Sequence, residues 1–116
     1  MTIEFFEESS AATRTLPRSL ATKAGGFVFV SGQVARDENG DVTARGIEAH
    51  TRQTMKNVAY ALAAAGCELE HVVKTTVWLD DARDFDDFNR IYSEIFPGNR
   101  PARSTMGCAP PRASWS

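Results

Sequence analysis

The chain has 116 residues and a mass of 12.7 kDa, so we expect residues 1–116 to form a single domain with one core. Hydrophobic residues make up 42% and charged residues 24% of the chain, which is typical of a folded globular protein and excludes a disordered one. Lys and Arg number 13 against 15 Asp and Glu, and the formal net charge of −2 argues against a nucleic-acid partner, which would call for a broad basic surface.

Short motifs, or their absence, argue against several other classes of protein. Segment 1–8 is acidic where a signal peptide is basic, and no stretch approaches the roughly 18 apolar residues of a membrane span, so we expect a cytoplasmic protein without a membrane partner. Cys67 and Cys108 form no Cys-x-x-Cys pair, and the histidines are only His50 and His71. Their spacing favours neither a metal site nor a catalytic triad.

The first elements in chain order are two antiparallel strands. Gly25-Gly26 separates the strand-like runs 19–24 and 27–31, and two glycines supply the positive φ values of a tight hairpin. A second turn is predicted at Asn39-Gly40. From Gly46 onward, apolar or small side chains recur every three or four residues, which predicts a long amphipathic helix that ends at Gly66. Its expected buried stripe is Ile47, Thr51, Thr54, Val58, Leu62 and Ala65.

The second half of the chain predicts a strand, a helix and a further extended segment. Residues 72–79 are rich in β-branched and aromatic side chains and form the strongest strand signal. A helix is expected from about Asp84 to Phe96, ended by Pro97-Gly98, and 100–106 returns as extended chain. One face of the strand is expected to carry Val73, Thr75, Val77 and Leu79, and one stripe of the helix Phe85, Phe88, Tyr92 and Ile95. This order predicts an α+β fold with both helices on one sheet face.

A few polar residues suggest a small pocket for an anionic ligand. Ser31-Gly32 ends a strand, Asn89 and Tyr92 share a helix, and Arg103 follows a rigid Pro-Ala step. A guanidinium binds a carboxylate through two parallel hydrogen bonds, so such a group of residues could hold a small acid. Each residue also has a structural interpretation: a bend for Gly32, a solvated helix face for Asn89, a core stripe for Tyr92 and a surface ion pair for Arg103.

In combination, these residues resemble the RidA (YjgF) family of enamine and imine deaminases from about Pro17 to Thr105. Residues 26–33 are similar to the family's "(V/I)SGQ" strand, 73–79 to its "VKTTVFL" strand, and 100–105 to its "PARS" signature. Two further segments, 53–58 and 84–92, are similar to its two helices. Five matches in the right order make the resemblance specific.

The resemblance implies a chorismate-mutase-like fold, a mixed sheet with two helices on one face, that assembles as a homotrimer with clefts between subunits. It also implies that Arg103 binds the carboxylate of a small 2-imino or 2-enamino acid, and that water then hydrolyses the imine to a 2-keto acid and ammonia. No cofactor is required, because an iminium carbon is already electrophilic. The residues that would line the cleft are Ser31, Gly32, Asn89, Tyr92 and Thr105.

Two departures from the family pattern bear on the activity. Arg18 stands where relatives carry an aromatic residue, which adds a cation and favours dicarboxylate ligands. No acidic residue follows Glu94, and the atypical tail 107–116 contains adjacent prolines, so the family's closing strand with its Glu is expected to be missing. Slow deaminase activity and a non-catalytic, trimeric keto-acid-binding protein therefore remain as alternatives. An endoribonuclease is the third choice because of the low charge.

Overall fold

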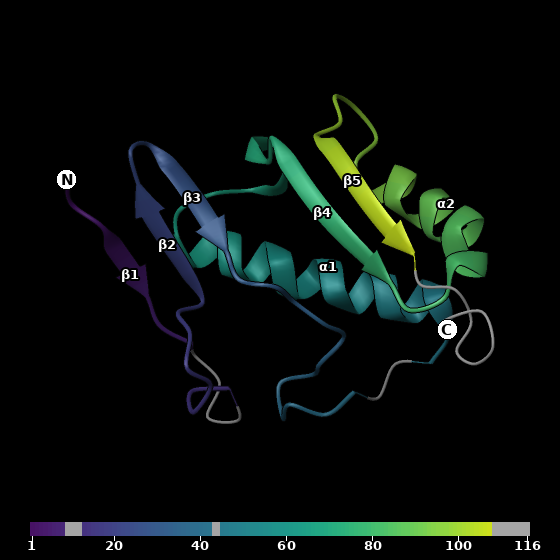
Figure 1. Cartoon of the computed structure of the whole chain (residues 1–116), viewed down its shortest axis with the longest axis horizontal. Coiled ribbons are helices and arrows are strands. Elements are labelled where there is room, and N and C mark those ends of the chain that lie inside the picture. Colours follow the sequence, from purple (N-terminus) through teal and green to yellow (C-terminus); the bar gives the residue numbers. More distant parts are fainter. Residues whose placement is uncertain (9–12, 43–44, 108–116) are drawn as a thin grey trace, which may run out of the picture. The chain divides into compact units, whose positions relative to one another are not determined.

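The computed structural model describes residues 1–8, 13–42 and 45–107, shown in colour in Figure 1. The chain divides into two compact units, Met1–Leu69 and Glu70–Ser116, each of which is described by itself. Apart from Gly107, the tail for which a missing strand was expected lies outside the described residues. That residues 1–116 form one domain stays a prediction.

The first unit contains a three-stranded antiparallel sheet of β1 (Glu4–Phe6), β2 (Ala21–Ala24) and β3 (Phe27–Val30), in that order. The predicted hairpin is confirmed: β2 pairs with β3, and Gly25 and Gly26 connect them with φ values of 59° and 83°. Both values lie in the left-handed region that glycine adopts without strain. The strand β1 was not predicted, because three residues are too few to show an alternating pattern.

The two faces of this sheet differ in burial. Ala21 is buried and Val28 and Val30 are half-buried on one face, and α1 contacts β3. The register places Phe5 opposite Thr22 and Thr22 opposite Phe29, so these side chains share the other face. The exposed side chains there are Phe5 at 64%, Phe27 at 61% and Phe29 at 61%. Large aromatic groups therefore lie on the open face of the first unit.

The helix α1 (Gly46–Ala64) is the long helix that the sequence predicted. Gly66 ends it with a φ of 79°, and the Cys67 N–H donates to the Leu62 carbonyl at 2.8 Å, as in a glycine-terminated helix. The predicted stripe is confirmed, because Thr51, Leu62 and Ala65 are buried and the other three members are half-buried. Ala61 is also fully buried, so the apolar face of the helix is wider than the stripe.

The second unit is built on a parallel pair of strands, β4 (Lys74–Leu79) and β5 (Ala102–Gly107). Thr75 pairs with Arg103 in the register, and Val77 pairs with Thr105, so these side chains share one face. Leu79 is buried and Thr75 and Val77 are half-buried on this face. The predicted strand began at residue 72, but β4 begins at Lys74, so Val73 precedes the strand and is 70% exposed.

The crossover between the parallel strands contains a short 3₁₀ turn, η2 (Ala82–Asp84), and then the helix α2 (Phe85–Ile95). Asp81 begins the 3₁₀ turn, since its side chain accepts a hydrogen bond from the Arg83 N–H. The helix buries Phe88, Tyr92 and Ile91, and Ile91 is the largest fully enclosed side chain of those described. Phe85 lies at the margin of the predicted stripe, 41% exposed.

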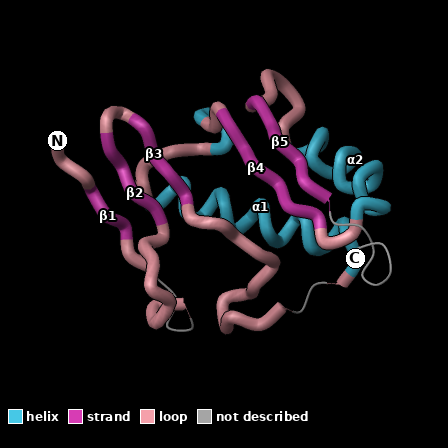
Figure 2. Tube along the Cα trace, in the orientation of Figure 1, coloured by secondary structure: helices cyan, strands magenta, loops and turns pink. Residues whose placement is uncertain are grey.

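Both kinds of strand pairing and two long helices are therefore present, and the predicted α+β class is confirmed (Figure 2). A parallel strand pair requires a crossover connection, and α2 supplies it within the second unit. Of the helices in the described part of the chain, none has the length and apolar character needed to cross a membrane.

Candidate functional site

An open cavity of about 270 Å³ lies in the second unit, between residues of α2 and the start of β5. Positions 89, 92 and 93 follow the helical spacing of three and four residues, so α2 presents them on one side. The remaining lining residues belong to the segment that enters β5 and to the strand itself. The cavity is lined by Asn89, Tyr92, Ser93, Arg100, Pro101 and Arg103. Three residues predicted for the site, Asn89, Tyr92 and Arg103, are thus brought together.

The guanidinium of Arg103 lies over aromatic rings. Its Cζ atom is 4.9 Å from the ring centroid of Tyr92, 5.6 Å from that of Phe88 and 5.8 Å from that of Phe85. Ring faces attract a cation by about 0.5–2 kcal/mol, depending on its desolvation. Within the described residues, no carboxylate or carbonyl accepts a hydrogen bond from Arg103. The aromatic rings therefore position the cation while its N–H groups stay available to an anion.

Tyr92 is the ring nearest to this cation, and its hydroxyl is already engaged. The Tyr92 hydroxyl and the Thr75 Oγ1 are 2.8 Å apart, which ties α2 to β4. The ring also packs between Phe88 and Phe96, with centroid distances of 5.4 and 4.9 Å. Tyr92 is therefore fixed on both sides and forms a wall of the cavity rather than a free phenol group.

Two buried oxygen atoms near Arg103 lack a partner. Asn89 Oδ1 and Thr105 Oγ1 are buried, and neither has a hydrogen bond within the described residues. Asn89 lines the cavity, and Thr105 lies two residues after Arg103 on the same strand face. An unsatisfied buried polar atom typically costs about 1–3 kcal/mol, so native structures rarely keep one without a reason. Both atoms belong to residues that the sequence predicted for the site.

The other predicted residues, Ser31, Gly32 and Arg18, form a separate group within the first unit. Ser31 Oγ donates to the Ser19 carbonyl at 2.6 Å. Arg18 Nη1 donates to the Gly32 carbonyl at 2.7 Å, and its Nε lies 3.0 Å from Glu8 Oε1. Glu8 is 7% exposed, so the added cation at position 18 has a buried counter-ion. That this group lines the same cleft as Arg103 stays a prediction.

The sequence analysis did not predict four residues of these two groups: Glu8, Ser93, Arg100 and Pro101. Ser93 Oγ donates to the Asn89 carbonyl at 2.9 Å, one helical turn back. Arg100 Nε donates to the Phe96 carbonyl, also at 2.9 Å, at the end of α2. The available signal was the pair of arginines that flank Pro101-Ala102, because both border one rigid step of the chain.

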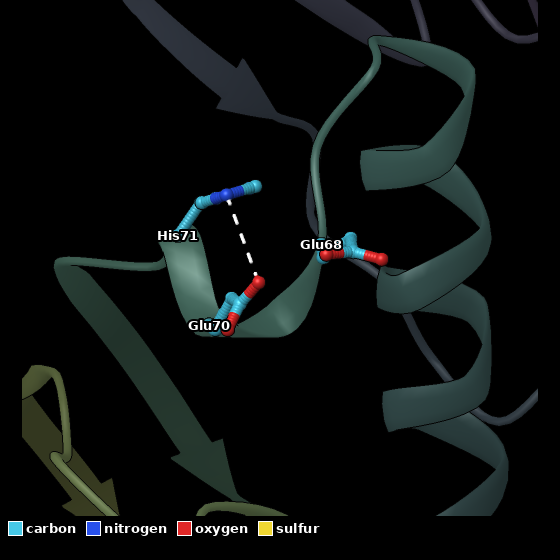
Figure 3. A group of neighbouring side chains, drawn as sticks. All are labelled: Glu68, Glu70 and His71. Carbon is cyan, nitrogen blue, oxygen red and sulfur yellow. Dashed lines mark ion pairs between the residues drawn. The ribbon is translucent and has the colours of Figure 1, made fainter.

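A group of exposed side chains at η1 (Leu69–His71) contains residue types that bind metals. Figure 3 shows Glu70 and His71 with Glu68, which precedes them in the chain. Glu70 Oε1 and His71 Nε2 are 4.0 Å apart. All three side chains are exposed, and exposed acidic groups commonly lie together without an ion. We therefore assign no function to them.

Comparisons with known proteins identify the family of the chain. The family model described as "Endoribonuclease L-PSP" matches residues 9–114. The chain is 42% identical over 88 residues to a RutC family protein of Pyrococcus horikoshii, covering 75% of this chain and 70% of that protein. It is 39% identical over 94 residues to the human 2-iminobutanoate/2-iminopropanoate deaminase, covering 80% and 69%.

A solved structure of a related protein has a similar fold. The crystal structure of the YjgF gene product from E. coli superposes with a TM-score of 0.81 at 30% identity, covering 94% of this chain and 89% of that one. The family match compares sequences, and the superposition compares backbone geometry. The chain belongs to the RidA/YjgF family and has its α+β, chorismate-mutase-like fold.

Proposed function

We propose that the chain is a hydrolytic deaminase of small 2-imino and 2-enamino acids, and that Arg103 holds the substrate carboxylate. The observation that carries the proposal is the Arg103 guanidinium, which lies on three aromatic rings at the cavity with its N–H groups unengaged in the described residues. The cavity of about 270 Å³ is below the range of about 300–1,000 Å³ typical of drug-sized ligands, so it suits a small metabolite. The human relative's name supports the reaction class.

The reaction needs orientation more than a cofactor. Two parallel N–H···O bonds from Arg103 would fix the carboxylate and with it the adjacent C=N carbon. Water adds to that carbon and forms a carbinolamine; the C–N bond then breaks as the oxygen–carbon double bond forms, and ammonia leaves. One imine and one water thus give one keto acid and one ammonia, with no change in oxidation state. Holding the two reactants in register supplies the rate advantage.

The two unpartnered oxygen atoms fit the rest of the substrate. Asn89 lines the cavity, its buried Oδ1 is an acceptor without a partner in the described residues, and a substrate iminium offers N–H donors. Thr105 Oγ1 lies on the same strand face as Arg103 and can both donate to and accept from a water molecule. We assign Asn89 to the imine nitrogen and Thr105 to the attacking water.

Turnover should be slow, because none of the six residues that line the cavity in the described part of the chain is acidic. A positioned general base typically contributes 10²–10⁴-fold to the rate, about 3–5 kcal/mol of barrier. The same observation supports the alternative, a protein that binds keto acids without turning over their imines. The assay described below separates the two.

The assembly that we propose is a homotrimer with the site in clefts between subunits. Each unit has an open sheet face with large apolar groups: Phe5, Phe27 and Phe29 in the first, and Trp78, 72% exposed, with Met106 in the second. Contiguous apolar surface of this kind is normally covered in an oligomer. Light scattering should report three chains per particle, and a monomer or dimer at micromolar concentration would contradict the proposal.

The test is release of ammonia and keto acid from small imines that an amino-acid oxidase generates in the assay. The wild type should accelerate release above buffer. Arg103→Lys keeps the charge but loses the two-pronged geometry, and Arg103→Ala loses both, so keto-acid affinity should fall about ten- to a hundredfold, more in the second variant. Arg52→Gln, which removes one exposed charge from α1, is the matched control. Keto-acid binding without any turnover would support the binding protein instead.

A further inference from the structure

The cavity contains a second guanidinium that the proposed reaction does not use. Arg100 and Arg103 both line it, and no carboxylate does so among the described residues. Both cations therefore border the same volume of about 270 Å³. A single substrate carboxylate needs only one of them. The charge of this cavity therefore exceeds what a monocarboxylic imino acid can neutralise.

The position of Arg100 is defined by the end of α2. Its Nε donates to the Phe96 carbonyl at 2.9 Å, where the carbonyl end of the helix favours a cation. Pro101, the next residue, restricts the backbone and also lines the cavity. Because Nε is hydrogen-bonded to the end of the helix, the two terminal nitrogens of Arg100 remain to bind a ligand. These contacts orient the side chain without neutralising its charge.

Other polar groups of the cavity are already engaged or carry a different chemistry. Ser93 Oγ donates to the Asn89 carbonyl, and the Tyr92 hydroxyl bonds Thr75. Among the described residues, the charged groups of the cavity are two guanidinium groups, and Asn89 Oδ1 is a buried acceptor without a partner. Two cations separated by a short step match two carboxylates on one small molecule, and the acceptor matches an N–H donor.

We infer that Arg100 is a specificity-determining residue, and that the site prefers ligands with a second carboxylate, namely 2-imino dicarboxylic acids and the corresponding 2-keto dicarboxylic acids. This inference rests on the proposed function and names the substrate class of the same site. The sequence suggested the same preference through Arg18, but the structure pairs that cation with Glu8 and the Gly32 carbonyl. Arg100, in contrast, lines the Arg103 cavity together with Arg103, and no carboxylate of the described residues lines that cavity.

The experiment compares two keto acids of equal length, 2-oxoglutarate and 2-oxopentanoate, which differ only in a terminal carboxylate or methyl group. Titration calorimetry of the full chain at low salt should show 2-oxoglutarate binding about three- to tenfold tighter, a range that allows for the exposure of Arg100. Arg100→Gln should abolish this difference and change 2-oxopentanoate affinity less than about twofold. Arg100→Lys should restore part of it, and Arg52→Gln should leave it unchanged.

Three results would overturn the inference. The wild type could bind both keto acids equally, the preference for 2-oxoglutarate could survive Arg100→Gln, or this variant could lose affinity equally for both ligands. The imine assay separates this outcome from the proposed function. Hydrolysis of monocarboxylic imines without a dicarboxylate preference would overturn the inference alone. An Arg100-dependent preference with no imine hydrolysed would support the inference and overturn the deaminase proposal.

Discussion

The two units use their polar side chains differently. In the first unit, the candidate site residues bond to the protein itself: Ser31 to the Ser19 carbonyl, and Arg18 to Glu8 and Gly32. In the second unit, the Arg103 guanidinium and Asn89 Oδ1 have no hydrogen-bond partner in the described residues. Of the candidate site residues in the described part of the chain, those with polar atoms lacking a hydrogen-bond partner therefore lie in the second unit, and those of the first unit bond to its own backbone and to Glu8.

The connection between strands explains this difference. A parallel pair needs a long crossover connection, which here contains α2. This helix packs on one face of β4 and β5, so side chains of α2 and β5 meet around the cavity. The antiparallel hairpin of the first unit needs only Gly25-Gly26, which contributes no side chain. The following predictions test whether the second unit depends on its packed helix and the first on its polar contacts.

The largest effect is expected from Ile91→Ala. Ile91 is 0% exposed, and loss of its side chain leaves a cavity under α2, which typically costs about 2–5 kcal/mol of unfolding free energy. Urea denaturation measures the loss of unfolding free energy, and the rate of amide hydrogen exchange should increase most in β4 and β5. Ile3→Ala, at a side chain 48% exposed, is the control and should cost well under half as much. Equal effects would show that α2 packing does not stabilise the second unit.

Gly107→Ala should be the next most damaging change. A Cβ at this position would lie 3.0 Å from Ala82 Cβ and 3.1 Å from its Cα, and the backbone atom cannot move aside as a flexible side chain would. Overpacking of this kind costs about 1–3 kcal/mol. Gly98→Ala is the matched control, because nothing lies within 4 Å of a Cβ there. Thermal unfolding of both variants should show a lower midpoint only for Gly107→Ala.

In the first unit, Glu8→Ala should cost about 1–2 kcal/mol, because it leaves the partly buried Arg18 without its counter-ion. Glu48→Ala breaks an exposed pair with Arg52 on α1 and should cost only about 0.3–0.5 kcal/mol. Urea denaturation of the two variants gives the comparison. If Glu8→Ala were as mild as the control, polar contacts would not be what holds this unit.

The smallest effect concerns pH. The hydrogen bond from the Arg83 side chain, with that from its backbone N–H, lowers the pKa of Asp81. A carboxyl whose pKa is lower in the folded state stabilises the fold above its unfolded pKa, and the contribution is lost as pH falls through the folded value. NMR titration should show the Asp81 pKa moving up towards its ordinary value in Arg83→Gln. An unchanged pKa in that variant would exclude Arg83 as the cause.

Local signals in the sequence predicted much of the fold. The Gly25-Gly26 hairpin, the end of α1 at Gly66 and the strand at 74–79 depend on backbone preference and alternation, which neighbouring residues determine. The strand β1 and the burial of Ile91 were missed: β1 is too short to carry a pattern, and Ile91 lies between two members of the predicted stripe.

The site was predicted in part, for a similar reason. Motif resemblance identified Arg103, Asn89 and Tyr92, which the structure brings to one cavity. The hydrogen-bond partners of individual side-chain atoms could not be predicted from the sequence. Whether a guanidinium bonds a carboxylate, as in Arg18, or a helix end, as in Arg100, depends on side-chain directions that only the fold determines.

The register of β5 also limits how the gene can change in length. Arg103 and Thr105 face α2 because side chains alternate along the strand, so one codon deleted or inserted between Pro101 and Arg103 would turn the guanidinium to the opposite face. A single insertion inside α2 would rotate Asn89 away from Tyr92 by about 100°. Length variation among homologues should therefore be selected against inside α2 and at the start of β5, and also at residues 97–99 wherever Arg100 must keep its contact with the Phe96 carbonyl.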